Sequence, residues 1–411
     1  MKITFRTFRS SIYAIVCLIS FLIASSLHSY TPAAQAAPPA SAAAAATGPA
    51  GSPMAIGASA PDFDLPGVDG KNHKLSDYAS AKILAIVLES DHSPASQLYE
   101  GRIGKLYESY KDKGVALVAI SPDSPDAVAI DQMAYTDEGD GLEDMKDAAE
   151  YRHIDWPYLY DGDKQTAAKV LGATTTPEIF IFDQARNLQY RGRIDDNIDE
   201  SLVKSRDAQS AIDALLAGQP VAVATTEANG TPINWASGKA NAQAKIAKIE
   251  TEPISVSLAS KDELGKIRSN PTGKYLVVNF WATWCGPCVG EFPDLQETYR
   301  MFRNRDLTFI TISENDPTEK AGVMDFLRKE HASSENYLFS DSNVYTMQAA
   351  FDPEMPGAVP VTFLFAPNGD VLYQQVGDLD TMKLRRAILA NLPDTKEYPG
   401  EQKYWSSLAG N

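Results

Sequence analysis

Two cysteines stand in the segment Trp284-Cys285-Gly286-Pro287-Cys288, a spacing that suits thiol–disulfide exchange. They follow residues 274–280, an apolar run of the kind that forms a buried strand. A helix that begins at the pair would offer free N–H groups and the positive end of its dipole, which favour a thiolate. We therefore expect Cys285 to attack and Cys288, on the same helix face, to resolve the mixed disulfide.

Such a pair also occurs in zinc sites, haem attachment sites and structural disulfides. A zinc half-site would need a second pair or nearby histidines, and the 5 histidines are scattered along the chain. Haem attachment would need a histidine at position 289, which is Val289. A structural disulfide stays open as an alternative, because an exported protein can use one. We expect neither a metal nor a cofactor.

The segment around the cysteines has a counterpart earlier in the chain, which indicates an internal repeat. Residues 82–88 align without a gap with residues 274–280. The same register places Ser93 on Cys285 and Ser96 on Cys288. In each copy the apolar residues that follow are spaced three to five apart, which predicts a helix with one buried face.

Further matches extend the repeat beyond this helix. A strand is predicted at 115–121 in the first copy and at 307–313 in the second, and residues 176–182 later match residues 359–365. Both copies then enter a turn and return through another strand. The predicted fold class is α/β, with two tandem domains that each contain a central mixed β-sheet flanked by helices.

The second copy resembles the TlpA/ResA/CcmG group of thioredoxin-like proteins. The resemblance rests on residues 278–288, Val-Asn-Phe-Trp-Ala-Thr-Trp-Cys-Gly-Pro-Cys, followed by Glu291-Phe292-Pro293, and covers about residues 254–393. It implies a thioredoxin fold in which the paired cysteines exchange disulfides with exported client proteins. It also implies a cis-proline that faces the pair.

The resemblance suggests roles for further residues. Val359-Pro360 matches the cis-proline position, although an edge-strand or turn proline is the alternative interpretation. Thioredoxin has a buried carboxylate where this chain has Asn279, so Glu291 becomes the candidate proton acceptor. A solvated glutamate on the helix surface is the alternative. The residues expected to contact clients are Trp284, Gly286, Pro287 and Val359.

The first copy resembles the AhpC/TSA-type thioredoxin-like family over about residues 56–235, through Tyr99-Glu-Gly-Arg-Ile103, residues 171–178 and residues 190–196. Members of that family carry a cysteine in place of Ser93, and often another in a Gly-Cys-Pro-Ile segment that here reads Gly230-Thr-Pro-Ile233.

Both thiols are therefore absent from the first copy, and a serine hydroxyl cannot form a disulfide. His92 stands beside Ser93, but no acid that would orient it is evident in the sequence. We expect a redox-inactive domain that binds, orients or shields a client or the other domain.

The N-terminus predicts export. Lys2, Arg6 and Arg9 precede the apolar run 12–24, and Ala34-Gln-Ala36 offers a cleavage site, so residues 1–36 are predicted to be a signal peptide. An uncleaved membrane anchor is the alternative. The formal net charge of −17, without a basic cluster interleaved with aromatic residues, argues against nucleic-acid binding.

The predicted order is a signal peptide (1–36), an Ala/Pro-rich linker (37–55), the AhpC/TSA-type domain (56–217), a connector (218–250), the catalytic domain (251–395) and a tail (396–411). The predicted function is disulfide reduction or exchange in exported, periplasmic client proteins. A membrane electron donor of the thiol-disulfide type would be a partner, and the N-terminus would be the only membrane contact. Peroxide reduction by the same pair, or a non-catalytic binding protein with a structural disulfide, are the alternatives.

Overall fold

The computed structural model describes residues 52–392. The predicted signal peptide, nearly all of the linker and the tail lie outside the described residues. Within the part that is described, none of the helices combines the length and the apolar character needed to cross a membrane.

The first domain is built on a five-stranded sheet in the order β5-β4-β3-β7-β8. Strands β3, β4 and β5 are parallel, and β7 and β8 run antiparallel, so the sheet is mixed. Its elements are β1 (Asp64–Pro66), β2 (Asn72–Lys74), β3 (Ile83–Leu88), α1 (Pro94–Tyr110), β4 (Val115–Ser121), α2 (Leu142–Arg152), β5 (Tyr158–Tyr160), α3 (Thr166–Leu171), β6 (Thr175–Thr176), β7 (Glu178–Phe182), β8 (Leu188–Gly192), α4 (Asp207–Leu216) and β9 (Thr231–Pro232).

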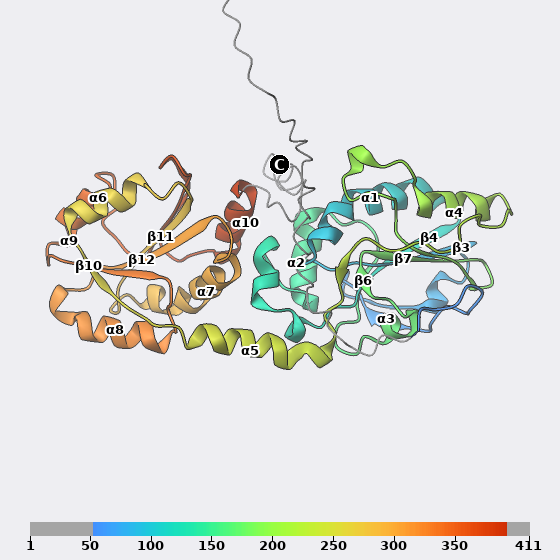
Figure 1. The fold of residues 1–411 in the computed structure, drawn as a ribbon, viewed down its shortest axis with the longest axis horizontal. Helices are drawn as coiled ribbons and strands as arrows, with labels where there is room; N and C mark the ends of the chain where they lie inside the picture. The colour runs from blue at the N-terminus through green and yellow to red at the C-terminus, as the bar shows by residue number, and fades with distance from the viewer. Residues whose placement is uncertain (1–51, 393–411) are drawn as a thin grey trace, which may run out of the picture. The chain divides into compact units, whose positions relative to one another are not determined.

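Strand β3 shows why this sheet needs helices on both faces. All six of its residues are buried, and alternate side chains belong to different apolar clusters. Ile83 packs with residues of α1 and α4, whereas Leu84 packs with residues of α3. Figure 1 shows α1 and α4 on one side of these strands and α3 on the other.

The second domain repeats this plan with a six-stranded mixed sheet in the order β10-β13-β12-β11-β14-β15. Its elements are β10 (Ser257–Ala259), α6 (Lys261–Ser269), β11 (Tyr275–Trp281), α7 (Gly286–Phe302), β12 (Leu307–Ser313), α8 (Lys320–Lys329), β13 (Glu335–Phe339), α9 (Val344–Phe351), β14 (Val361–Phe365), β15 (Val371–Val376) and α10 (Thr381–Asn391). Helices α6 and α9 cover one face, and α7 and α10 cover the other (Figure 1).

The strand register confirms the repeat that the sequence predicts. Ile83 pairs with Val115 in the first domain, and Tyr275 pairs with Leu307 in the second, as the ungapped alignment requires. Both sheets also have a shift in strand register at the same place, between the last two residues of β7 and between the last two residues of β14. The predicted fold class, two tandem domains with mixed sheets flanked by helices, is confirmed.

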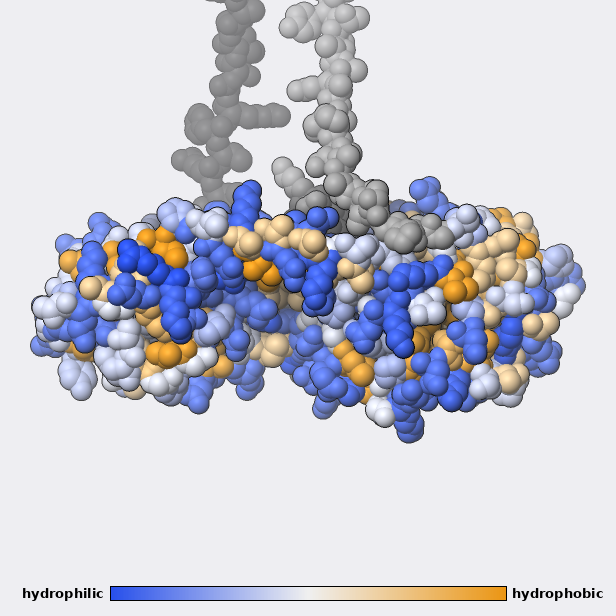
Figure 2. Space-filling view, turned by 90° about the horizontal axis from the view of Figure 1, so that it is seen from below, coloured by the Kyte–Doolittle hydropathy of each residue, from blue (hydrophilic) through white to orange (hydrophobic). Residues whose placement is uncertain are grey.

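The predicted connector, residues 218–250, contains more structure than its weak apolar periodicity suggests. It includes β9 and the helix α5 (Lys239–Glu250). Ile233 and Trp235 are buried in the core of the first domain. Figure 2 shows one face of the molecule, on which hydrophilic residues predominate and hydrophobic ones form small separate groups. This agrees with the acidic composition.

Candidate redox site

The two cysteines lie where the central strand β11 gives way to helix α7. Cys285 is the residue that caps the helix, and its sulfur accepts a hydrogen bond from the N–H of Cys288 (3.3 Å). Pro287 lies in the first turn, where a missing N–H costs nothing. The short connection between a buried strand and a helix therefore holds the pair at the positive end of the helix dipole.

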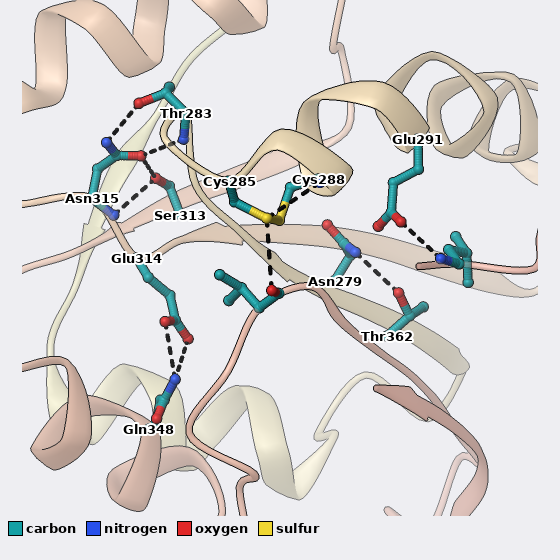
Figure 3. The surroundings of a disulfide bond; sticks show 12 residues. Asn279, Thr283, Cys285, Cys288, Glu291, Ser313, Glu314, Asn315, Gln348 and Thr362 are labelled. Carbon is teal, nitrogen blue, oxygen red and sulfur yellow. Dashed lines mark hydrogen bonds between the residues drawn. A yellow bond between two sulfur atoms is a disulfide. The ribbon is translucent and has the colours of Figure 1, made fainter. Parts of the chain in front are cut away.

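Cys285 and Cys288 form a disulfide, with their Cα atoms 5.3 Å apart. The two residues differ in accessibility, because Cys285 is 6% exposed and Cys288 is fully buried. Cys285 therefore lies nearer the surface than Cys288, although both are largely buried in the disulfide form. Figure 3 shows the disulfide between Cys285 and Cys288, with Glu291 further along the same helix.

The loop that carries Val359 ends in a cis peptide bond between Val359 and Pro360. The carbonyl oxygen of Val359 lies 3.7 Å from Cys285 Sγ. The structure thus brings Pro360 and the cysteine pair together, although 72 residues separate Cys288 from Pro360 in the sequence. Three of the four predicted client-contact residues, Trp284, Gly286 and Pro287, are exposed at this end of the domain, and Val359 is half-buried.

Glu291 lies one helical turn after Cys288, so both side chains occupy one face of α7. It is half-buried, and one carboxylate oxygen accepts a hydrogen bond from the N–H of Leu379 (2.8 Å), as Figure 3 shows. Burial raises the pKa of Glu291 to about 7, and Asp378 adds to the rise, whereas Leu379 and Asn279 oppose it. A carboxyl group with this pKa can accept and return a proton near neutral pH.

A second carboxylate in this region was not foreseen from the sequence. Glu314 directly follows β12, and its carboxylate accepts two hydrogen bonds from the side-chain amide of Gln348 (2.8 and 2.9 Å). Burial raises the pKa of Glu314 to about 7, and Gln348 opposes the rise. The sequence offered one indication of this residue, because Glu314 stands at the carboxyl end of the strand beside β11, where functional groups gather in such sheets.

The loop that presents Trp284 is held by Asn315. The side-chain oxygen of Asn315 accepts a hydrogen bond from the N–H of Thr283 (2.9 Å), and its amide donates to the Thr283 hydroxyl (2.7 Å). Trp284 itself is 62% exposed. The loop is therefore fixed while the indole ring of Trp284 remains free to contact another molecule.

The corresponding place in the first domain has the same geometry without sulfur. Ser93 caps α1 and accepts a hydrogen bond from the N–H of Ser96 (3.1 Å). Its hydroxyl donates to the carbonyl of Thr176 (3.2 Å), which precedes the cis-proline Pro177. Cys285 has the two corresponding neighbours, the N–H of Cys288 and the carbonyl of Val359.

His92 has an orienting acid that the sequence did not reveal. Its Nδ1 lies 2.5 Å from the carboxylate of Asp140, and both side chains are buried. Burial by itself would lower the pKa of His92, but Asp140, with help from Asp123 and Asp91, raises it to about 9. A histidine that is protonated at neutral pH is not a base, so it cannot activate Ser93.

Among residues 52–392, no three His, Cys, Asp or Glu side chains are grouped so that they could hold a metal ion.

The family comparisons agree with this geometry. Residues 56–191 match the AhpC/TSA family, and residues 251–390 match the Redoxin family. The chain therefore contains two thioredoxin-like domains, one in the region that matches the AhpC/TSA family and one in the region that matches the Redoxin family.

Curated relatives of the chain are named as thiol-disulfide oxidoreductases. ResA of Bacillus subtilis is 29% identical over 111 residues, which cover 27% of this chain and 58% of ResA. ResA of Geobacillus kaustophilus is 27% identical over 120 residues, which cover 29% of this chain and 64% of that protein. The chain thus spans less than two thirds of the length of these relatives.

A solved structure of an uncharacterized conserved protein from Geobacillus kaustophilus is 32% identical, covering 44% of this chain and 92% of that one, with a TM-score of 0.40.

Proposed function

We propose that the second domain reduces or exchanges disulfides in exported client proteins through Cys285 and Cys288. The observation that carries the proposal is the asymmetry of the pair. Cys285 keeps a small exposed area (6%) at the start of a helix and beside a cis-proline loop, whereas Cys288 has none. A purely structural disulfide would not need this asymmetry.

In the reducing direction, the Cys285 thiolate attacks one sulfur of the client disulfide, and the other client sulfur leaves and takes up a proton. The Cys288 thiolate then attacks Cys285, which releases the second client thiol and forms the disulfide seen in the structure. Two electrons and two protons pass to the client. A dithiol donor must reduce the pair again, and we propose a membrane protein of the thiol-disulfide type for this role.

We propose that Glu291 takes the proton of Cys288 before the second step. Its position one turn along the same helix face and its pKa of about 7 support this role. Pro360 and Val359 would hold the client beside the pair, together with Trp284. Export through residues 1–36 remains our proposal, with or without a lasting membrane tether.

The test is a disulfide-reduction assay with dithiothreitol as the electron donor. The wild type should turn over, and Cys285→Ser should abolish turnover. Ser93→Ala, at the aligned position of the first domain, is the matched control and should keep full activity. Redox titration should give a pair that equilibrates with dithiothreitol.

Two results would overturn the proposal. A pair that stays oxidised, with no turnover in any variant, would make the protein a stapled binding protein. Turnover of hydrogen peroxide that exceeds turnover of protein disulfides would favour the peroxide reductase.

A further inference from the structure

The first domain holds a segment of its own chain beside its cis-proline. Strand β9 pairs antiparallel with β6, the strand that leads directly into Pro177, and Thr231 lies opposite Thr176. The hydroxyl of Ser93, at the position aligned with Cys285, accepts a hydrogen bond from the Thr231 hydroxyl (2.9 Å) while its own proton points to the carbonyl of Thr176. Thr231 therefore occupies the place from which a client cysteine would meet the attacking sulfur.

The segment then crosses the start of α1. Three residues after Thr231, the amide of Asn234 lies 3.1 Å from His92 Nε2. The backbone of Asn234 is also held, because its N–H donates to the carboxylate of Asp123 and its carbonyl accepts from the N–H of Ser124 (3.0 Å). Residues 231–234 thus follow a track from the cis-proline strand, past positions 93 and 92, to the loop after β4.

The second domain has residues at the aligned positions of this track, but the side chain of Asn315, which takes the place of Asp123, is hydrogen-bonded to Thr283. The pairs of aligned positions are Ser93 with Cys285, Thr176 with Val359, His92 with Trp284, Asp123 with Asn315 and Ser124 with Asp316. The geometry agrees with this alignment at both ends. The attacking position lies 3.2 Å from the carbonyl before the cis-proline in the first domain and 3.7 Å in the second. The loops that follow β4 and β12 each enter a short helix at a proline, which is Pro125 in the first domain and Pro317 in the second.

The two tracks differ in occupancy. In the first domain Ser93 and Thr176 are fully buried beneath the inserted segment. In the second domain Ala358 is exposed, Val359 is half-buried and Trp284 is 62% exposed. Within residues 52–392, no strand pairs with residues 357–359. The backbone differs at Gly357, which has a φ of +75°, so we transfer the pairing only to Ala358 and Val359.

We propose that residues 231–234 occupy the first domain in the way that a bound client segment would. The second domain binds an extended client segment in the same position and selects the residue three positions after the client cysteine. This inference rests on the proposed function. The client cysteine takes the place of Thr231, opposite Val359, and the next residue lies opposite Ala358. The side chain three positions on reaches Trp284, as Asn234 reaches His92. Because Trp284 is a large exposed aromatic ring, it favours an apolar side chain there.

The first experiment tests this selectivity on the full chain. The substrates are decapeptides with one cysteine in a mixed disulfide with glutathione, carrying Leu or Gly three residues after the cysteine. Dithiothreitol keeps the enzyme reduced, and glutathione release is followed. We expect kcat/KM to be about tenfold higher for the Leu peptide, as for one well-packed apolar side chain.

Variants of Trp284 connect that preference to the indole ring. Trp284→Ala should reduce the Leu-to-Gly ratio to about one, and Trp284→Phe should restore most of it, since a phenyl ring still offers an apolar face. An unchanged ratio in Trp284→Ala, or a wild type that does not discriminate, would overturn the assignment. A preference that moves to a different peptide position would overturn it equally.

The second experiment tests the backbone pairing. In a paired strand, the N–H groups of alternate residues point toward the neighbouring strand. The N–H of Ile233 donates to the carbonyl of Thr174 (3.1 Å), so the N–H of Thr231, two residues earlier, also points toward β6. Pro232 lies between them and has no N–H to donate. An N-methyl group on the client cysteine should therefore lower kcat/KM about three- to tenfold. N-methylation one residue later, at the place of Pro232, should have no effect. Equal losses at both positions would refute the pairing.

Failure of this inference can be told apart from failure of the proposed function. Turnover of all peptides at one rate would leave a disulfide reductase without the proposed binding mode. Absence of turnover with every peptide and with glutathione disulfide would refute the function itself.

Discussion

Replacement of Glu291 by Gln should remove a proton acceptor that works near neutral pH. A free thiol has a pKa of about 8.5, so at pH 7 only about 3% of such a thiol is ionised without help. Glu291, with a pKa of about 7, is half ionised at the same pH. Without the base only this small thiolate fraction remains reactive, so Glu291→Gln should lower turnover at pH 7 on the order of tenfold.

The pH profile identifies the cause of this loss. Wild-type turnover should rise with pH and level off above about pH 7, as Glu291 ionises. The profile of Glu291→Gln should keep rising through about pH 8.5, where the thiol ionises by itself, and should approach the wild type near pH 9. Glu297→Gln, on the same helix but half-exposed and paired with Arg385, is the matched control and should follow the wild type. Superimposable profiles for Glu291→Gln and the wild type would refute the reasoning.

The same carboxyl group makes a prediction about stability. Because burial raises the pKa of Glu291 above its ordinary 4.5, the folded chain binds this proton more tightly than the unfolded chain. Stability therefore falls as pH rises from about 4.5 to about 7 and is level above that. A fully buried group would account for about 3 kcal/mol, and solvent screening of a half-buried one reduces this to about 1–2 kcal/mol. Glu291→Gln should be more stable by that amount at pH 8 and equal to the wild type at pH 4, as measured by urea unfolding.

Three further predictions follow from the cysteine pair and its counterpart. Cys288→Ser should trap a mixed disulfide with a client, visible on a non-reducing gel; steady turnover in this variant would exclude a resolving role. Asp140→Asn should destabilise the first domain by about 3 kcal/mol at pH 6, because Asp140, with smaller contributions from Asp123 and Asp91, overcomes the effect of burial and raises the pKa of His92 from 6.5 to about 9. That contribution is complete below about pH 6.5 and disappears above about pH 9, so a pH-independent difference in urea midpoints would contradict it. Ser93→Cys combined with Thr231→Cys should form a second disulfide, since the two hydroxyl oxygens lie 2.9 Å apart; two thiols that stay titratable would refute this.

Local patterns in the sequence were sufficient for the repeat and for the cysteine pair. The ungapped match between residues 82–88 and 274–280 was enough to place Ser93 on Cys285, and the paired strands have that register. Strands buried on both faces carry long apolar runs, and such runs can be aligned by eye. Helix α7 was likewise predicted from apolar spacing, with its start at the cysteines.

Other features depend on residues that are distant in sequence, so no local pattern predicts them. Asp140 reaches His92 across 48 residues, and Leu379 reaches Glu291 across 88. Residues 231–235 have too few apolar side chains to predict a buried segment, yet Ile233 and Trp235 lie in the core.

The sequence by itself determined the fold class, the repeat and the position of the cysteine pair, because each depends on short apolar runs and on the identity of two residues. The tertiary structure decided which sulfur lies nearer the surface, which carboxyl groups have a raised pKa, and that a segment of the chain pairs with the strand before the cis-proline of the first domain. Burial and pairing across a sheet bring together residues from distant parts of the chain, and only the folded arrangement specifies which of them meet.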